Sequence, residues 1–204
     1  MFEENEKFMD QRFSNNFVLM TGLLVSKDRN ADNVDSKRPV LDFEVLFQSE
    51  DGPCIEAIPA LLSGGPLARS LPGLIVGAIY EIGGYVRNDE EQGLYVEVTK
   101  LVKLCENKKT SNPISLMRVR LMEMEMVPNV AMVIGKVKSC QYGLLQVRVE
   151  RETLTKGDLT DADEITVDAL DTKPPQIGDM IVCIGQLCRS SLFADKIIAL
   201  KEES

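Results

Sequence analysis

Residues Asn16–Leu24 have the sequence NFVLMTGLL, and 113 positions later residues Asn129–Val137 have the sequence NVAMVIGKV. Both copies begin with Asn, continue with five mostly apolar residues and place Gly at the seventh position. A second echo joins Gly77–Val86 to Gly178–Leu187 at an offset of 101, so the interior of the second copy is shorter. Self-similarity of this kind indicates a repeated structural unit. The sequence therefore predicts two copies of one small β-fold.

Each copy contains five β-rich runs. Those of the first are 17–25, 40–47, 54–58, 76–87 and 94–104, with a short helix at 67–71. Those of the second are 129–138, 144–151, 164–170, 180–187 and 193–200, and residues 173–178 replace the helix. Strand, strand, strand, short helix, strand, strand is the order of an oligonucleotide/oligosaccharide-binding (OB) barrel. We therefore predict an all-β chain of two tandem OB-fold five-stranded Greek-key barrels, with a short helix in the first.

The chain divides into four predicted regions: an N-terminal arm or short helix (1–13), a first OB-fold domain (14–106), a linker with a Met-rich segment (107–126) and a second OB-fold domain (127–204). Apolar residues of the arm form a stripe suited to packing or a dimer contact. The segment 114–126 interleaves Leu, Val and Met with Arg and Glu, which predicts an extra strand or a short helix. Whether that segment packs within the chain or between chains is left open.

The composition is that of a globular protein able to bury a core, with 44% apolar and 27% charged residues. The longest apolar run, 71–79, contains Pro72, Gly73 and Gly77 and is too short to span a membrane. The acidic N-terminus lacks the basic and apolar regions of a secretory signal. A cytoplasmic location with no membrane contact is therefore expected.

No signature of catalysis, a metal site or a cofactor site stands out. The chain has no histidine, which removes the usual general base at neutral pH. It contains neither a glycine-rich phosphate loop nor a Gly-x-Ser-x-Gly turn. Its five cysteines form no Cys-x-x-Cys pair, so buried, reduced thiols are expected. The sequence predicts a non-enzyme without cofactors.

Several segments resemble bacterial single-stranded DNA-binding proteins. Residues 16–24 are similar to their opening strand, 41–45 to their second strand, and 67–71 with 76–87 to their helix and fourth strand. The primosomal replication protein N is equally similar in the last stretch. The resemblance covers residues 16–104 and, more faintly, 129–200. It implies sequence-tolerant binding of single-stranded DNA by four barrels per assembly, which a tandem chain reaches as a homodimer.

Binding of single strands needs aromatic faces for stacking and cations for phosphates. The candidate stacking residues are Phe47, Tyr80, Tyr85 and Tyr95, and the candidate phosphate contacts are Lys27, Arg29, Lys37, Arg38 and Arg87. Core packing is the favoured interpretation of Phe47. Tyr80 and Tyr85 have opposite strand phases, so at most one of them faces the core. The loop from Lys27 to Arg38 also fits a solvated loop whose cations are diluted by aspartates.

Other features weigh against nucleic acid. The net charge is −9, there is no tryptophan, and only 5% of residues are aromatic. Cys54, Ile55 and Asn88 stand where the resembled family commonly has aromatic residues. The short end 201–204 lacks that family's long acidic tail. The second half retains two rings and four cations of interest, Tyr142, Phe193, Lys136, Lys138, Arg148 and Arg189, which favours a structural or partner-docking role there.

Two hypotheses of function follow. The first is a sequence-tolerant single-stranded DNA-binding protein, accessory to DNA replication, recombination or repair. The alternative is a protein–protein interaction or assembly module on an OB scaffold, with a protein partner and little or no nucleic-acid binding. The pI of about 4.7 and the Met-rich segment favour the alternative, and the resemblance favours the first.

Overall fold

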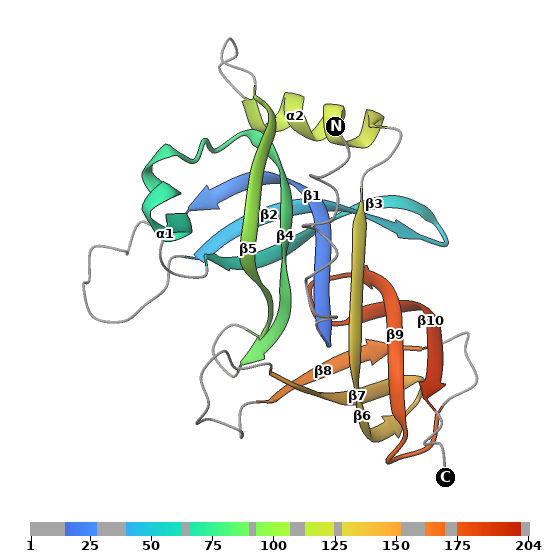
Figure 1. Ribbon diagram of the computed structural model, residues 1–204. Helices are drawn as coiled ribbons and strands as arrows, with labels where there is room; N and C mark the ends of the chain where they lie inside the picture. Colours follow the sequence, from blue (N-terminus) through green and yellow to red (C-terminus); the bar gives the residue numbers. More distant parts are fainter. Residues whose placement is uncertain are drawn as a thin grey trace, which may run out of the picture.

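The computed structural model describes residues 15–27, 40–62, 66–89, 93–106, 113–124, 128–151, 162–169 and 175–200 (Figure 1). The strands are β1 (Asn16–Lys27), β2 (Val40–Ser49), β3 (Gly52–Leu62), β4 (Ala78–Asp89), β5 (Gly93–Glu106), β6 (Asn129–Gln141), β7 (Leu144–Glu150), β8 (Ala162–Asp168), β9 (Met180–Leu187) and β10 (Leu192–Leu200). The helices are α1 (Pro66–Ser70), the 3-10 turn η3 (Leu71–Gly73) and α2 (Pro113–Glu123). The predicted N-terminal arm, 1–13, lies outside the described residues.

The strands pair into two closed rings with the same connectivity. In the first, β1 pairs with β2 and β4, β2 pairs with β3, β3 runs parallel to β5, and β5 pairs with β4. In the second, β6 pairs with β7 and β9, β7 with β8, β8 runs parallel to β10, and β10 pairs with β9. This is the Greek-key order of the OB fold. The prediction of an all-β OB-fold chain is confirmed.

The short helix is also where the sequence predicts it. The α1 and η3 turns connect β3 to β4. No helix lies between β8 and β9 in the described residues on either side of 170–174. Some strand bounds differ from the prediction: β3 extends to Leu62 because its last residues run parallel to β5. β8 begins at Ala162, two residues before the predicted start.

The two rings are joined by the antiparallel pair β1–β6, which has the symmetry of the repeat. Val18 lies opposite Ala131, and these two residues are equivalents at the offset of 113. Asn16 pairs with Val133 and Met20 pairs with Asn129, as a local two-fold axis between β1 and β6 requires. The two copies therefore meet as the subunits of a symmetric dimer would.

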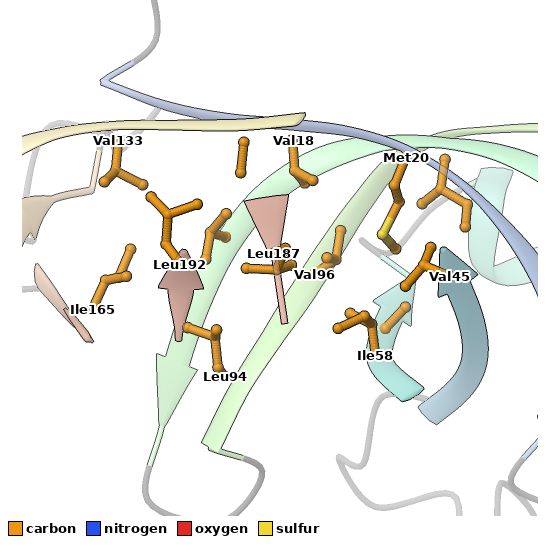
Figure 2. Packing of buried hydrophobic residues seen from close by; sticks show 14 of the residues in the cluster. Val18, Met20, Val45, Ile58, Leu94, Val96, Val133, Ile165, Leu187 and Leu192 are labelled. Atoms are coloured by element: carbon orange, nitrogen blue, oxygen red, sulfur yellow. The ribbon is translucent and has the colours of Figure 1, made fainter. Parts of the chain in front are cut away.

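A single cluster of buried apolar side chains runs through both rings. Figure 2 shows Val18, Val96 and Leu94 of the first ring beside Leu187 and Leu192 of the second. The alternating buried residues of each strand supply this cluster, as the pleat of a strand requires. The division of the chain at residues 107–126 stays a prediction, and the core itself is continuous across it.

Two glycines let strands bend where the copies echo each other. The pairing of β4 with β5 shifts register between Gly83 and Gly84, which places the bulge that the Gly-Gly pair indicates. A Cβ atom on Gly84 would lie 2.1 Å from the carbonyl oxygen of Glu97. A Cβ atom on Gly185, the equivalent in the repeat, would lie 1.9 Å from that of Phe193. Both positions therefore require glycine.

The Met-rich segment forms a helix that packs within the chain. Met117 and Leu121 of α2 are buried against Leu23 and Ile79. Arg118 forms a two-pronged ion pair with Glu44 of β2, and this contact raises the pKa of Arg118. Of the two structures that the sequence left open, extra strand or short helix, the helix is observed. The opposite side of α2 exposes Leu116, Val119 and Met122.

Candidate nucleic-acid interface

Three of the four predicted stacking rings are buried. Tyr80 is 3% exposed, its ring packs edge-on against Phe43, and its hydroxyl accepts a hydrogen bond from the backbone N–H of Ile75 at 2.8 Å. Tyr95 is 5% exposed. Phe47 lies edge-on against Phe193 of the second half at 5.7 Å between ring centres. A ring enclosed in this way offers no free face to a base. The stacking role of the candidates Tyr80 and Tyr95 is therefore corrected to packing, and Phe47 packs in the core, which is the interpretation that the sequence favours over stacking.

Tyr85 is the one predicted ring that lies outward, as the opposite phase of Tyr80 and Tyr85 requires. The guanidinium of Arg87 lies 5.1 Å from the centre of its ring. Arg87 also pairs through Nε with Glu97 at 2.9 Å and through Nη1 with Asp163 at 3.1 Å. Its side chain is 12% exposed. Arg87 is therefore committed to two carboxylates and is not placed to contact phosphate, contrary to the prediction.

Asp163 is a residue that the sequence did not single out. It is fully buried, and its carboxylate accepts hydrogen bonds from Arg151 Nε at 2.9 Å and Nη2 at 2.8 Å. The same carboxylate accepts from the backbone N–H of Asn88 at 3.0 Å. Asn88 Nδ2 in turn donates to the carbonyl of Glu164 at 2.6 Å. This cluster connects the end of β4 to β8, so Arg87 and Asn88 connect the two halves.

Of the predicted phosphate contacts between Lys27 and Arg38, the described residues include only Lys27. Lys27 Nζ donates to the carbonyl oxygens of Leu74 at 2.7 Å and of Leu71 at 3.4 Å, which ties the end of β1 to η3. Its ammonium therefore satisfies carbonyls of the turn. Arg29, Lys37 and Arg38 lie outside the described residues, and their role as phosphate contacts stays a prediction.

The outer surface of the second ring of strands, β6–β10, carries exposed cations. The sequence favours a structural or partner-docking role for this half of the chain. Lys136 and Lys138 are exposed on β6, and Arg148 lies opposite Lys136 on β7. Tyr142, in the turn between these strands, is 97% exposed. The same hairpin therefore carries an exposed ring and cations, the two kinds of group that single-stranded nucleic acid requires. The spacing Lys136-x-Lys138 in an alternating strand is the sequence signal that could have indicated it.

A second feature of the surface is an apolar face centred on the β1–β6 pair. Phe17 and Leu19 on β1 are 40% and 36% exposed, and Val130 on β6 is 41% exposed. Phe17 lies opposite Met132, and Leu19 lies opposite Val130. The four side chains therefore form one patch over the local two-fold axis.

The cysteines are free thiols, and burial raises the pKa of Cys183 from 9.0 to about 12. In the described residues no group of three or more His, Cys, Asp or Glu side chains is placed to hold a metal ion. None of the helices in that part of the chain is both long and apolar enough to cross a membrane.

Comparison with known proteins shows the fold. No family model and no curated protein sequence matches the chain. Two structures of the single-stranded DNA-binding protein from Thermus aquaticus align with 93% of this chain, the wild type at TM-score 0.58 and 15% identity and a deletion mutant at 0.60 and 14%. They align over 94% and 96% of their own lengths. PriB from Ralstonia solanacearum aligns with 44% of this chain and 98% of its own, at TM-score 0.34 and 16% identity. The chain shares the OB fold of the Thermus aquaticus protein along nearly its whole length.

Proposed function

We propose that this protein binds single-stranded DNA with little sequence preference, as an accessory of DNA replication, recombination or repair. The observation that carries the proposal is the fold that it shares, over both rings, with the Thermus aquaticus single-stranded DNA-binding protein. We take the protein to act by binding, without catalysis. Because fold alone does not specify a ligand, the proposal also needs side chains that suit a nucleic acid.

The residues that remain as contacts differ from the predicted set. In the first half of the chain, the outward-facing Tyr85 is retained as a candidate stacking residue. Arg29, Lys37 and Arg38 remain predicted phosphate contacts. The burial of Phe47, Tyr80 and Tyr95 removes them from the interface. The net charge of −9 means that phosphate contacts depend on local groups of cations rather than on the field of the whole protein.

Binding is tested by following the anisotropy of a labelled oligo-dT at low salt while protein is added. A complex at low micromolar protein that weakens as salt rises supports the proposal, because phosphate contacts release counterions. No complex under these conditions discards it. A duplex of the same length is the control, and it should bind more weakly.

We also propose that the protein is a homodimer in which the apolar face over β1 and β6 is covered by the same face of a second copy. The face is centred on a local two-fold axis, so it can pair with itself. Exposed apolar side chains gathered in one patch favour such burial. Two copies then bring four barrels together.

The dimer is tested by light scattering with the variant Leu19→Glu, which places a charge in the middle of the face. The expected result is a monomer, because a buried unpaired carboxylate is costly. Ile177→Glu is the matched control, since Ile177 is 69% exposed in a turn outside this face. A dimer that persists in Leu19→Glu, or a wild type that is monomeric, contradicts the proposal.

The alternative function, docking of a protein partner, is favoured by one observation. Leu116, Val119 and Met122 are 43%, 52% and 51% exposed on the outward side of α2, although α2 is anchored from its other side. A partner recovered with the protein after nuclease treatment and lost with Val119→Glu supports this alternative. Intact oligo-dT binding by the same variant shows that the two surfaces are separate.

A further inference from the structure

Strands β6 and β7 form a hairpin (Figure 1), and three cations, Lys136, Lys138 and Arg148, lie on it. Lys136 and Lys138 are two residues apart on β6 and both are exposed, and the pairing of β6 with β7 shifts register between Val137 and Ser139. Neither lysine forms an ion pair with any residue in the described part of the chain. Arg148 lies opposite Lys136 and pairs with Glu150 at 2.9 Å, but both side chains are exposed and such a pair is weak.

The tip of the same hairpin holds a tyrosine in an unusual place. Tyr142 has φ +52° and Gly143 has φ +81°, so both turn residues lie in the left-handed region. Two-residue hairpin turns of this kind favour Asn-Gly, because residues with larger side chains adopt positive φ at a cost. Tyr142 is 97% exposed, so its ring makes almost no packing contact that offsets this cost. Local structure and packing therefore give no reason for a ring here.

We propose that this hairpin binds single-stranded nucleic acid, with Tyr142 stacked on a base and Lys136, Lys138 and Arg148 contacting phosphates. The inference rests on the proposed function. It adds the second ring of strands, β6–β10, to the surface that contacts nucleic acid. Charge complementarity and the exposed ring select this occupant over a protein, since flat rings and cations are what an unpaired strand needs.

The residues around these cations indicate the path that a bound nucleic acid takes over the surface. On the β7 side, Arg148 lies opposite Glu164 of β8 and pairs with Glu150, so this flank is anionic. On the β9 side, Lys136 lies opposite Met180, an apolar residue that is 37% exposed. A polyanion therefore follows β6 and β9 rather than crossing β8.

The first test uses the absence of tryptophan from the chain. The variant Tyr142→Trp places one indole at the hairpin tip, so its fluorescence reports on this site alone. Stacking predicts quenching that follows the same titration curve as the anisotropy of a labelled oligo-dT. An indole signal that stays constant while the anisotropy rises overturns the inference.

The second test separates binding from folding. Tyr142→Asn supplies the residue that the turn favours, so the melting temperature should stay equal or rise. Loss of one stacked base should weaken oligo-dT binding about tenfold. If the Tyr142 ring had a structural role instead, the variant would have a lower melting temperature and unchanged affinity for oligo-dT. Unchanged affinity in Tyr142→Asn contradicts the inference.

The third test concerns the phosphates. In the double variant Lys136→Gln, Lys138→Gln, the slope of log affinity against log salt should become shallower by about 1.4. The matched control is Lys100→Gln with Lys103→Gln, which removes the same charge from lysines already paired with Glu81 and Glu106. If the wild type binds and the hairpin variants bind equally well, only this inference fails. If the wild type does not bind oligo-dT, the proposed function fails with it.

Discussion

The side-chain amide of Asn16 binds both backbone polar groups of Val86. Its Nδ2 donates to the carbonyl oxygen of Val86 at 2.5 Å, and its Oδ1 accepts from the N–H of Val86 at 2.9 Å. The second copy repeats the arrangement between Asn129 and Leu187, at 3.0 and 3.1 Å. Asn129 is the first residue of the repeated segment, as Asn16 is, and both side chains are buried. The asparagine that opens each copy is therefore explained by hydrogen bonding.

We predict that Asn16→Ala and Asn129→Ala each lower the free energy of unfolding by about 2–4 kcal/mol, because each leaves a buried N–H and a buried C=O without a partner. Urea unfolding followed by circular dichroism measures this. Gln141→Ala, at an exposed position of β6, is the control and should change stability by less than about 0.5 kcal/mol. A loss as small as that of the control in both asparagine variants would contradict the role assigned to the two amides.

Gly84→Ala should destabilise the fold by about 2–3 kcal/mol, since its Cβ atom would lie 2.1 Å from the backbone oxygen of Glu97 and strands β4 and β5 would have to separate. Thermal unfolding gives the measurement. Gly73→Ala is the matched control, because a Cβ atom there has no neighbour within 4 Å. Equal melting temperatures for the two variants would show that the bulge does not depend on glycine.

Asp163→Asn should cost about 3–5 kcal/mol of stability, because the change leaves Arg87 and Arg151 beside a neutral group in a buried cluster. A double-mutant cycle with Arg87→Met isolates the contact between the halves. If the two changes are additive, the Arg87–Asp163 pair does not couple the two rings.

Cys183 should resist thiol reagents in the folded protein, because it is buried and its pKa is raised to about 12. The raised pKa means that its stabilising contribution is complete below about pH 9 and declines as the pH rises toward 12. Labelling with a coloured disulfide reagent, with and without denaturant, should show one thiol that reacts only on unfolding. In Cys183→Ala, no thiol should require unfolding before it reacts. If one thiol of this variant still reacts only in denaturant, the protected cysteine is a different one.

The order of strands was predictable because strand pattern is local. The run 40–47 and the short helix at 67–71 depend on residues near in sequence, and the structure has β2 and α1 at these places. The segment 114–126 was harder, since Leu, Met, Arg and Glu suit a helix while Val suits a strand. Packing of Met117 and Leu121 against Leu23 and Ile79 selects the helix.

The candidate site was predictable only where strand phase decides burial. Phase indicated that at most one of Tyr80 and Tyr85 faces the core, and the structure buries Tyr80. Phase could not show that Tyr95 is buried, nor that Arg87 meets Asp163, a residue 76 positions later. The Arg87–Asp163 contact depends on how the second ring of strands lies against the first.

Sequence alone indicated a duplicated OB chain, because the repeat of apolar period and glycine position is recorded in the order of residues. The tertiary structure alone revealed that the copies share one core, that the Asp163 carboxylate joins them, and that the β6–β7 hairpin carries an exposed ring and, on β6, two lysines without an ion pair among the described residues. The physical reason is distance along the chain: local preferences determine strands and turns, whereas charge pairing and burial are determined by residues that only folding brings together.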